Sequence, residues 1–300
     1  MPIKPILFFM ATFAYAQLPP AADWAAHAQN EYQVFPNVTY LTATGYESKL
    51  DIYQRRDTAT HPTLIFFHGG GWVRGTKEAS AMSIVPWLEM GWNVVNVEYR
   101  MARVALAPAA VEDGLCALRY AVAQAKTYGI DTNRIVLSGE SAGGHLALTT
   151  GMIPESAGFT HVCAGGAFTQ SESAVPKVAA IINWYGITDV ADLLAGSNAR
   201  AYAVQWLGSL PNRDDLARRV SPLNYVRSGL PPILSIQGDA DPIVPYSQNV
   251  RLRDALLKAG VTAELLTIPG GGHGNFKPDE RTKIYLKIRE FLAKNGLGGA

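Results

Sequence analysis

A serine lies between glycines in the stretch GESAG, residues 139–143, directly after the apolar run RIVLS. A Gly-x-Ser-x-Gly between a strand and a helix is typical of a sharp turn that holds a nucleophilic hydroxyl exposed. Glycines flank such a serine because larger side chains would collide with the turned backbone. The helix that follows adds a field that favours developing negative charge. This placement favours Ser141 as a nucleophile over an idle serine in a Gly-rich turn.

A second glycine-rich stretch, HGGGW at residues 68–72, follows the apolar run TLIFF. Attack on a carbonyl produces a tetrahedral oxyanion, which backbone N–H groups stabilise, and glycines let the chain approach closely. We expect the N–H groups of Gly70, Gly71 and Ala142 to form this oxyanion hole. We expect His68 to brace the glycines rather than act as a base. The alternative, a phosphate-binding loop, is disfavoured because no Gly-Lys-Ser/Thr follows.

A serine nucleophile requires a histidine base and a carboxylate that fixes the tautomer of that base. With this type of turn the chain order is Ser, then Asp or Glu, then His. His273, in GGGHG after the run AELLTIP, lies at the end of a predicted strand. The acid position falls in GDADPIVP, which offers Asp239 and Asp241. We choose Asp241, because the prolines stiffen the loop that projects it, and expect Asp239 to cap the turn.

Competing interpretations remain for several neighbouring residues. A calcium loop at the two aspartates lacks the further oxygen ligands that the ion needs. Glu140, beside the serine, is expected to be buried and structural. Tyr99-Arg100 and Glu112-Asp113 form either an ion-paired brace or solvated surface charge. Four aromatic residues could line a substrate pocket or be ordinary core; they are Trp72, Trp184, Tyr185 and Trp206.

Composition limits the functional classes. The chain has 300 residues, of which 48% are hydrophobic and 17% charged, enough for one large core. The net charge of +1 gives no reason to expect nucleic acid or a membrane surface as a partner. The six histidines and two cysteines show no H-x-x-x-H or C-x-x-C spacing, so we expect neither a metal nor another cofactor. The sequence does not predict the oligomeric state.

The N-terminus has the pattern of a secretory signal peptide. Residues 1–16 contain Lys4, a short apolar stretch and a final Ala-Tyr-Ala, and the apolar part is too short to span a bilayer. The mature, exported domain would then be residues 17–300. An oxidising compartment permits a disulfide between Cys116 and Cys163, the alternative being two buried thiols that never meet.

Short continuous apolar runs alternate with helical patterns from about residue 62 onward. Such runs predict strands buried on both faces of a parallel sheet, with helices on either side. Two earlier stretches, residues 32–41 and 49–55, are predicted to be antiparallel edge strands. Residues 186–230 break the rhythm with short helices, which we interpret as a cap over a pocket. The predicted class is α/β, with a mostly parallel sheet.

The motifs together resemble the α/β-hydrolase superfamily, over roughly residues 40–295. The motifs are HGGGW, YR, GESAGG, DPIVP and GGGHG, in that order. The nearest likeness is to a group of bacterial feruloyl and acetylxylan esterases, arylformamidases and hormone-sensitive-lipase-like carboxylesterases. The lipase-like members usually carry an acid soon after YR, which YRMARVALAP lacks, so the resemblance favours the feruloyl or formamidase side. It implies the triad Ser141, Asp241 and His273 and a glycine-loop oxyanion hole.

The expected function is that of a secreted serine carboxylic ester hydrolase. Its substrates would be small or aromatic esters of the feruloyl or acetyl type, either small molecules or linked to carbohydrate. One alternative is an arylformamidase or another amide hydrolase with the same triad. A more distant alternative is a non-catalytic binding protein on the same scaffold, although such proteins generally lose a triad residue.

Overall fold

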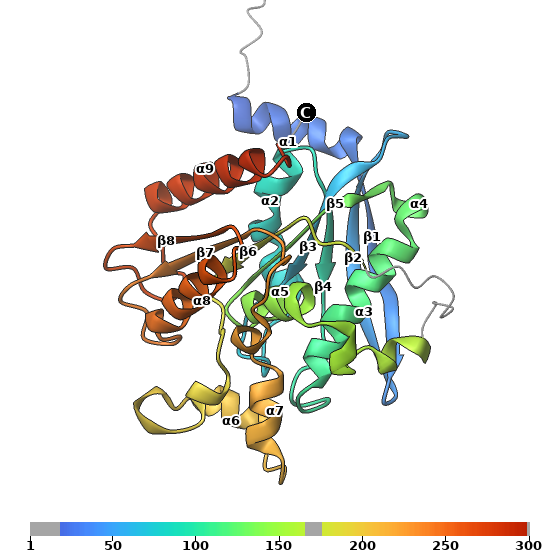
Figure 1. Ribbon diagram of the computed structural model, residues 1–300. Helices are drawn as coiled ribbons and strands as arrows, with labels where there is room; N and C mark the ends of the chain where they lie inside the picture. Colours follow the sequence, from blue (N-terminus) through green and yellow to red (C-terminus); the bar gives the residue numbers. More distant parts are fainter. Residues whose placement is uncertain (1–18, 166–175, 299–300) are drawn as a thin grey trace, which may run out of the picture.

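A single eight-stranded sheet organises the molecule (Figure 1). The structure is a computed structural model that describes residues 19–165 and 176–298, so the predicted signal peptide lies outside the described residues. The strand order is β1-β2-β4-β3-β5-β6-β7-β8. The strands are β1 (Tyr32–Ala43), β2 (Tyr46–Arg55), β3 (His61–Phe67), β4 (Asn93–Val97), β5 (Ile130–Glu140), β6 (Ala180–Trp184), β7 (Ile233–Gly238) and β8 (Ala263–Ile268).

The sheet is parallel from β4 to β8, and β1 and β2 extend it antiparallel. The predicted mostly parallel sheet is therefore confirmed. The prediction that both N-terminal strands are edge strands is wrong for β2, which pairs with β1 on one side and β4 on the other. The hairpin adds to the sheet through its second strand, and this leaves only β1 at that edge. Strand β8 forms the opposite edge.

Helices cover both faces of the sheet, which explains the continuous apolar runs. Every residue of β4 and of β6 is buried, because side chains on either face meet a helix layer. Helices α3, α5 and α8 contribute to one core cluster, whereas α2 and α9 contribute to the other. The helices are α1 (Pro20–Glu31), α2 (Ala81–Glu89), α3 (Ala109–Ala123), α4 (Ala125–Tyr128), α5 (Ala142–Met152), α6 (Ala201–Leu207), α7 (Arg213–Arg219), α8 (Tyr246–Lys258) and α9 (Pro278–Lys294).

The apolar spacing predicted for the last helix is confirmed. Ile284, Ile288, Phe291 and Leu292 are all buried on α9. On α3, Leu115 and Leu118 are buried, and Val122 is half-buried against the same cluster. No helix in the described part of the chain is both long and apolar enough to cross a membrane.

Residues 186–230 fold into two short α-helices and three 3₁₀ turns. Helices α6 and α7 lie beyond the strand ends in Figure 1 (yellow and light orange). The segment shares the main core, because Trp206 and Leu207 of α6 and Leu216 of α7 are buried in the same cluster as the sheet. The 3₁₀ turns are η4 (Ala191–Leu193), η5 (Gly196–Asn198) and η6 (Pro222–Tyr225).

The two cysteines form a disulfide in the structure. Cys116 lies in α3 and Cys163 lies in a 3₁₀ turn after α5, η3 (His161–Gly165), and their sulfurs are 2.01 Å apart. The bond joins residues 47 positions apart in the sequence. Both side chains are buried in the main core, so the bond fastens the loop after α5 to the helix layer.

Replacing both cysteines by alanine is expected to destabilise the protein. Loss of the 47-residue cross-link restores entropy to the unfolded chain, worth about 4 kcal/mol in the chain-entropy model. The melting temperature should fall by roughly 5–10 °C in a thermal melt followed by circular dichroism. Reduced wild type serves as the control and should melt close to the variant. A variant that melts within about 1 °C of the oxidised wild type would contradict this account.

Candidate active site

Ser141 occupies a strained turn between β5 and α5. Its backbone has φ 56° and ψ −116°, in the left-handed half of φ that residues other than glycine rarely adopt. Its N–H donates to the carbonyl of Trp184 at 2.9 Å, and its own carbonyl accepts the N–H of His145 at 3.0 Å. These two hydrogen bonds hold the turn in place, because a strained backbone conformation persists only where its surroundings fix it.

The glycines around Ser141 are required by close backbone packing. A Cβ added at Gly139 would lie 2.4 Å from the carbonyl oxygen of Gly143. A Cβ at Gly143 would lie 2.0 Å from the carbonyl oxygen of Phe67, at the end of β3. The first and last glycines of GESAG therefore let β3, β5 and α5 converge at one point, and the serine hydroxyl emerges there.

Three side chains that are distant in the sequence form one hydrogen-bonded chain. Ser141 Oγ lies 2.8 Å from His273 Nε2, and His273 Nδ1 lies 2.8 Å from Asp241 Oδ2. Since a carboxylate can only accept, Nδ1–H donates to Asp241, and Nε2 is left to accept the serine hydroxyl proton. Ser141 follows β5, Asp241 follows β7 and His273 follows β8, and the carboxyl ends of these strands meet at one edge of the sheet.

Asp241 is a buried carboxylate surrounded by donors. Its side chain is 0% exposed. Its Oδ1 accepts the N–H groups of Ile243 (2.8 Å) and Val244 (3.1 Å), and its Oδ2 accepts the amide of Gln237 (3.2 Å). Burial alone would raise the pKa of Asp241, but the hydrogen bond and charge of His273 and the two backbone N–H groups together lower it. The group is therefore an anion at neutral pH.

The structure separates the two aspartates of the DAD stretch. Asp239 does not reach His273; its Oδ1 accepts the N–H of Gly270 at 2.7 Å and so ties the loop after β7 to the loop after β8. Asp241, the aspartate that we chose, is the one in contact with the imidazole. The expected turn-capping role of Asp239 agrees with this bond.

The glycine loop after β3 lies against the serine. A Cβ added at Gly69 would be 3.6 Å from Ser141 Cβ and 3.0 Å from the carbonyl oxygen of Glu140. Gly70 and Gly71 have φ of 123° and 62°, and a Cβ at Gly70 would overlap the carbonyl oxygen of Arg74 at 1.8 Å. Only glycine fits this path.

The predicted oxyanion donors are free in the described part of the structure. The N–H groups of Gly70 and Gly71 donate to no other described residue. The N–H of Ala142 also lacks an acceptor there, because Ala142 is the first residue of α5 and has no preceding turn to bond. Three amides near the serine are thus available to an incoming oxygen.

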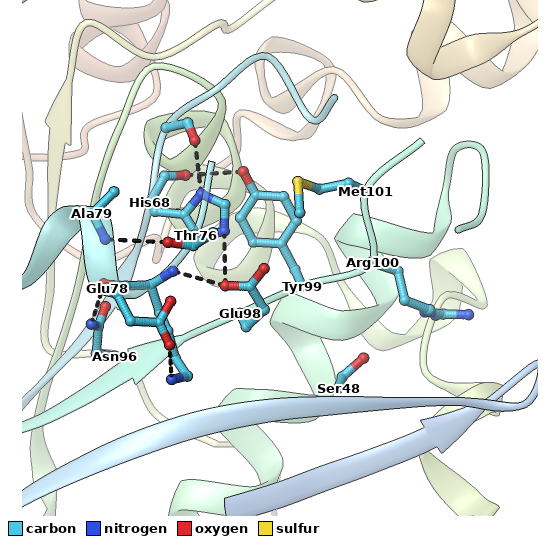
Figure 2. A network of polar contacts seen from close by, with 12 residues as sticks. Ser48, His68, Thr76, Glu78, Ala79, Asn96, Glu98, Tyr99, Arg100 and Met101 are labelled. Atoms are coloured by element: carbon cyan, nitrogen blue, oxygen red, sulfur yellow. Dashed lines mark hydrogen bonds and ion pairs between the residues drawn. The ribbon is translucent and has the colours of Figure 1, made fainter. Parts of the chain in front are cut away.

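A buried polar network holds the glycine loop from behind (Figure 2). His68 is 1% exposed, and its Nδ1–H donates to the carbonyl of Gly69 at 2.7 Å. Its ring stacks on Tyr99 with centroids 4.3 Å apart, and the Tyr99 hydroxyl donates to the His68 carbonyl at 3.0 Å. Glu98 Oε2 lies 3.6 Å from His68 Nε2 and accepts the N–H of Lys77. His68 thus braces the loop, as expected.

Two further expectations about charged residues can be answered. Arg100 is 2% exposed, and its Nε donates to Asp113 Oδ1 at 2.8 Å, while Asp113 is fully buried. Arg100 also reaches Glu112 Oε2 at 3.1 Å. These residues form a buried brace rather than solvated surface charge. Glu140 is half-buried rather than buried as expected, and it accepts the hydroxyl of Ser83, on α2, at 2.9 Å, which fits the structural role expected of it.

The aromatic residues expected to line a pocket are core residues in the structure. Trp72 and Trp206 are 0% exposed and stack with centroids 4.1 Å apart, and both contact the ring of His145 edge to face. Trp184 is 3% exposed and packs on Tyr285 of α9, in the helix layer. Of the four side chains, which all lie in the described part of the chain, that of Tyr185 contacts a triad residue, with its ring 4.7 Å from that of His273. Packing therefore explains the other three positions.

Sequence reasoning missed Tyr202, Arg200 and Gln237. Gln237 lies at the end of β7 and donates to both Asp241 and the carbonyl of Val244. Arg200 precedes the first residue of α6 and Tyr202 lies in its first turn, and both side chains reach the loop that holds Asp241. No local signal marks Arg200 or Tyr202, because their contacts lie about 40 residues away in the sequence. The partners of Gln237 are only 4 and 7 positions away.

Comparison with known proteins identifies the family. The BD-FAE family model matches residues 50–256. The chain belongs to the BD-FAE family. Among curated relatives, the esterase LipC of Mycobacterium tuberculosis is 30% identical over 236 residues, which is 75% of this chain and 56% of LipC. This BD-FAE chain thus spans little more than half the length of the first curated relatives, LipC and the esterase LipQ.

Other relatives match over most of their length. Ethyl acetate hydrolase of Pseudomonas putida is 28% identical over 289 residues, which cover 90% of this chain and 85% of the hydrolase. A solved structure titled as a truncated carbohydrate esterase from gut microbiota superposes with a TM-score of 0.73 and 29% identity. That superposition covers 88% of this chain and 98% of the solved one. The BD-FAE chain thus has the α/β-hydrolase fold that we expected.

The buried histidine behind the glycine loop should make the fold sensitive to acid. Burial lowers the pKa of His68 to about 4, although the bond to Gly69 opposes this. In the unfolded chain the histidine takes up its proton near pH 6.5, so the unfolded state binds more protons between pH 6.5 and 4. The free energy of unfolding should therefore fall by about 3 kcal/mol over that range on account of His68 alone.

Urea unfolding of wild type and His68→Asn at pH 6.5 and 4.5 measures this effect. The variant should be less stable at pH 6.5, because it loses the brace, but should lose less stability on acidification. His27→Asn, on the exposed face of α1, is the matched control and should keep the wild-type dependence. An equal pH dependence in wild type and His68→Asn would refute the assignment.

Proposed function

We propose that this BD-FAE chain is a serine carboxylic ester hydrolase with Ser141 as nucleophile, His273 as base and Asp241 as the orienting acid. The observation that carries the proposal is the unbroken path of 2.8 Å contacts from Ser141 Oγ through His273 to Asp241. The strained backbone of Ser141 fits the same chemistry, as do the amides beside it, which have no acceptor in residues 19–165 and 176–298. Names of its relatives agree, since several are esterases or ester hydrolases.

In the first half of the reaction, His273 Nε2 takes the proton of the Ser141 hydroxyl as Oγ attacks the ester carbonyl carbon. The carbonyl π electrons move to oxygen, and the N–H groups of Gly70, Gly71 and Ala142 stabilise the oxyanion. The ionised Asp241 stabilises the imidazolium. The oxyanion then re-forms the carbonyl, the C–O bond to the alcohol breaks, and the alcohol leaves with the proton from His273.

In the second half, water replaces the alcohol. His273 removes a proton from the water, whose oxygen attacks the acyl carbon, and the same amides hold the second oxyanion. Collapse releases the carboxylic acid, and the proton returns from His273 to Ser141 Oγ. Protons balance over the cycle, so the proposed reaction uses only ester and water.

For substrates, we propose small or aromatic acyl esters of the acetyl or feruloyl type, free or linked to carbohydrate. Support comes from names alone: ethyl acetate hydrolase among the curated relatives and a carbohydrate esterase among the solved structures. We also propose export. The pattern of residues 1–16 and the disulfide between Cys116 and Cys163 both suit a secreted chain. An arylformamidase would use the same side chains.

Ser141→Ala is expected to lose turnover of p-nitrophenyl acetate by at least about 10⁴-fold while retaining its fold. Wild type should also react covalently with a fluorophosphonate, detected by intact mass, whereas the variant should not. Unchanged circular dichroism controls for folding. Parallel rates on methyl ferulate, acetylated xylan and N-formylkynurenine separate esterase from formamidase. Absence of both labelling and ester turnover in the wild type would refute the proposal.

Asp241→Asn and Asp239→Asn form a matched pair two residues apart. Asp241→Asn leaves His273 Nδ1–H without a charged acceptor and favours the wrong tautomer, so kcat should fall by roughly 10³–10⁴-fold. Asp239→Asn keeps an oxygen that can accept the N–H of Gly270 and removes only the charge, so kcat should stay within about fivefold. The two kcat values on p-nitrophenyl acetate decide the assignment, and an equal loss in both variants would argue against Asp241 as the orienting acid.

A further inference from the structure

Tyr202 links residues 186–230, called the cap segment below, to the glycine loop of residues 68–72. It lies in the first turn of α6, and a Cβ added at Gly71 would lie 3.0–3.3 Å from its Cβ, Cγ and Cδ2. Its ring is also 5.9 Å from that of Trp72, the next residue of the loop. The Tyr202 side chain therefore packs directly on the backbone whose N–H groups are the proposed oxyanion donors.

The other end of the Tyr202 side chain reaches the loop between β7 and α8, residues 239–245, which carries Asp241 and is called the acid loop below. Its hydroxyl donates to the carbonyl of Ile243 at 3.4 Å, and the N–H of Ile243 donates to Asp241. Burial raises the pKa of Tyr202; the charge of Arg200 opposes this and that of Asp241 adds to it, so the phenol stays neutral. The ring thus spans the distance between the oxyanion loop and the loop that carries the triad acid.

Arg200 holds the start of α6 against the same loop. Its guanidinium donates to the carbonyls of Pro242 (3.2 Å) and Ile243 (2.9 Å) on the acid loop. It also donates to the carbonyls of Ser197 and Ala199 on the cap segment itself. Because one side chain bridges both segments, the Tyr202 ring has a fixed position relative to the triad.

We propose that Tyr202 is the wall that limits the length of the acyl group in the substrate. The inference rests on the proposed esterase function. The leaving alcohol must lie beside His273, which gives it the proton, while the carbonyl oxygen points to the glycine loop. The acyl chain is the third substituent of the reacting carbon and extends away from His273, along the loop on which Tyr202 packs.

The chemistry of this surface suits a short apolar chain. Tyr202 is half-buried, and one exposed apolar residue lies beside it: Ile243 on the acid loop is 39% exposed. A short acyl group can end against the phenol ring. A longer chain would have to displace the ring from Gly71 and from the carbonyl of Ile243.

The test compares kcat/KM on p-nitrophenyl acetate, butyrate and octanoate for wild type and Tyr202→Ala. Wild type should prefer acetate or butyrate. Each methylene that the removed ring allows to be buried is worth about fourfold, so the octanoate-to-acetate ratio should rise by at least roughly tenfold in the variant. Tyr202→Leu is a milder change that should move the ratio in the same direction if Tyr202→Ala does not fold.

Two variants serve as controls. Tyr202→Phe keeps the ring and should keep the wild-type ratio within about twofold. Val204→Ala, at an exposed position of the same helix, should do the same. A second substrate pair, 1-naphthyl acetate against p-nitrophenyl acetate, varies only the alcohol, and its ratio should not change in Tyr202→Ala.

The outcomes distinguish this inference from the function on which it rests. If wild type shows Ser141-dependent ester turnover but Tyr202→Ala and Tyr202→Leu keep its acyl preference, the function stands and the role of Tyr202 is overturned. A change confined to the alcohol pair also overturns it. If wild type shows neither ester turnover nor labelling of Ser141, both proposals fail together.

Discussion

The site depends on keeping one buried carboxylate charged. Asp241 is out of water, and an unpaired buried anion would take up a proton instead. The protein prevents this with local donors: the N–H groups of Ile243 and Val244 bond Oδ1, and the amide of Gln237 joins His273 at Oδ2. This arrangement fixes the imidazole tautomer, which in turn leaves Nε2 facing Ser141. The turn after β7 thus determines the state of the whole triad.

A second constraint is the closeness of the backbones that meet at Ser141. The ends of β3 and β5 and the start of α5 approach so tightly that side chains at Gly139 and Gly143 would overlap carbonyl oxygens. The same closeness brings Gly69 beside the serine, and it leaves nearby amides without an acceptor among the described residues. The close backbone packing and the oxyanion donors therefore have one origin, because the glycines that permit this packing also leave the N–H groups exposed. Behind the loop, His68 and Tyr99 keep this backbone in place.

Much of the fold and site could be predicted because the relevant signals are local. Continuous apolar runs identify strands of the central parallel sheet, and chain order with strand ends suggests Ser141, Asp241 and His273. Three kinds of feature could not be predicted this way. The place of β2 inside the sheet depends on pairing with β4. Trp72 and Trp206 are core residues because α6 brings Trp206 onto the ring of Trp72. Tyr202 touches Gly71 across about 130 residues, and nothing in its neighbours in the sequence indicates that contact.

The brace after β4 has a consequence for how the sequence can change over time. Arg100 and Asp113 are both sealed from solvent, so losing either partner strands an uncompensated charge in the interior, at a cost of roughly 3–5 kcal/mol. Losing both to a well-packed apolar pair is far less harmful. A chain with a single substitution at either position is therefore poorly stable, whereas a chain with both positions changed together is not. Descendants of this chain should keep both residues or replace them together.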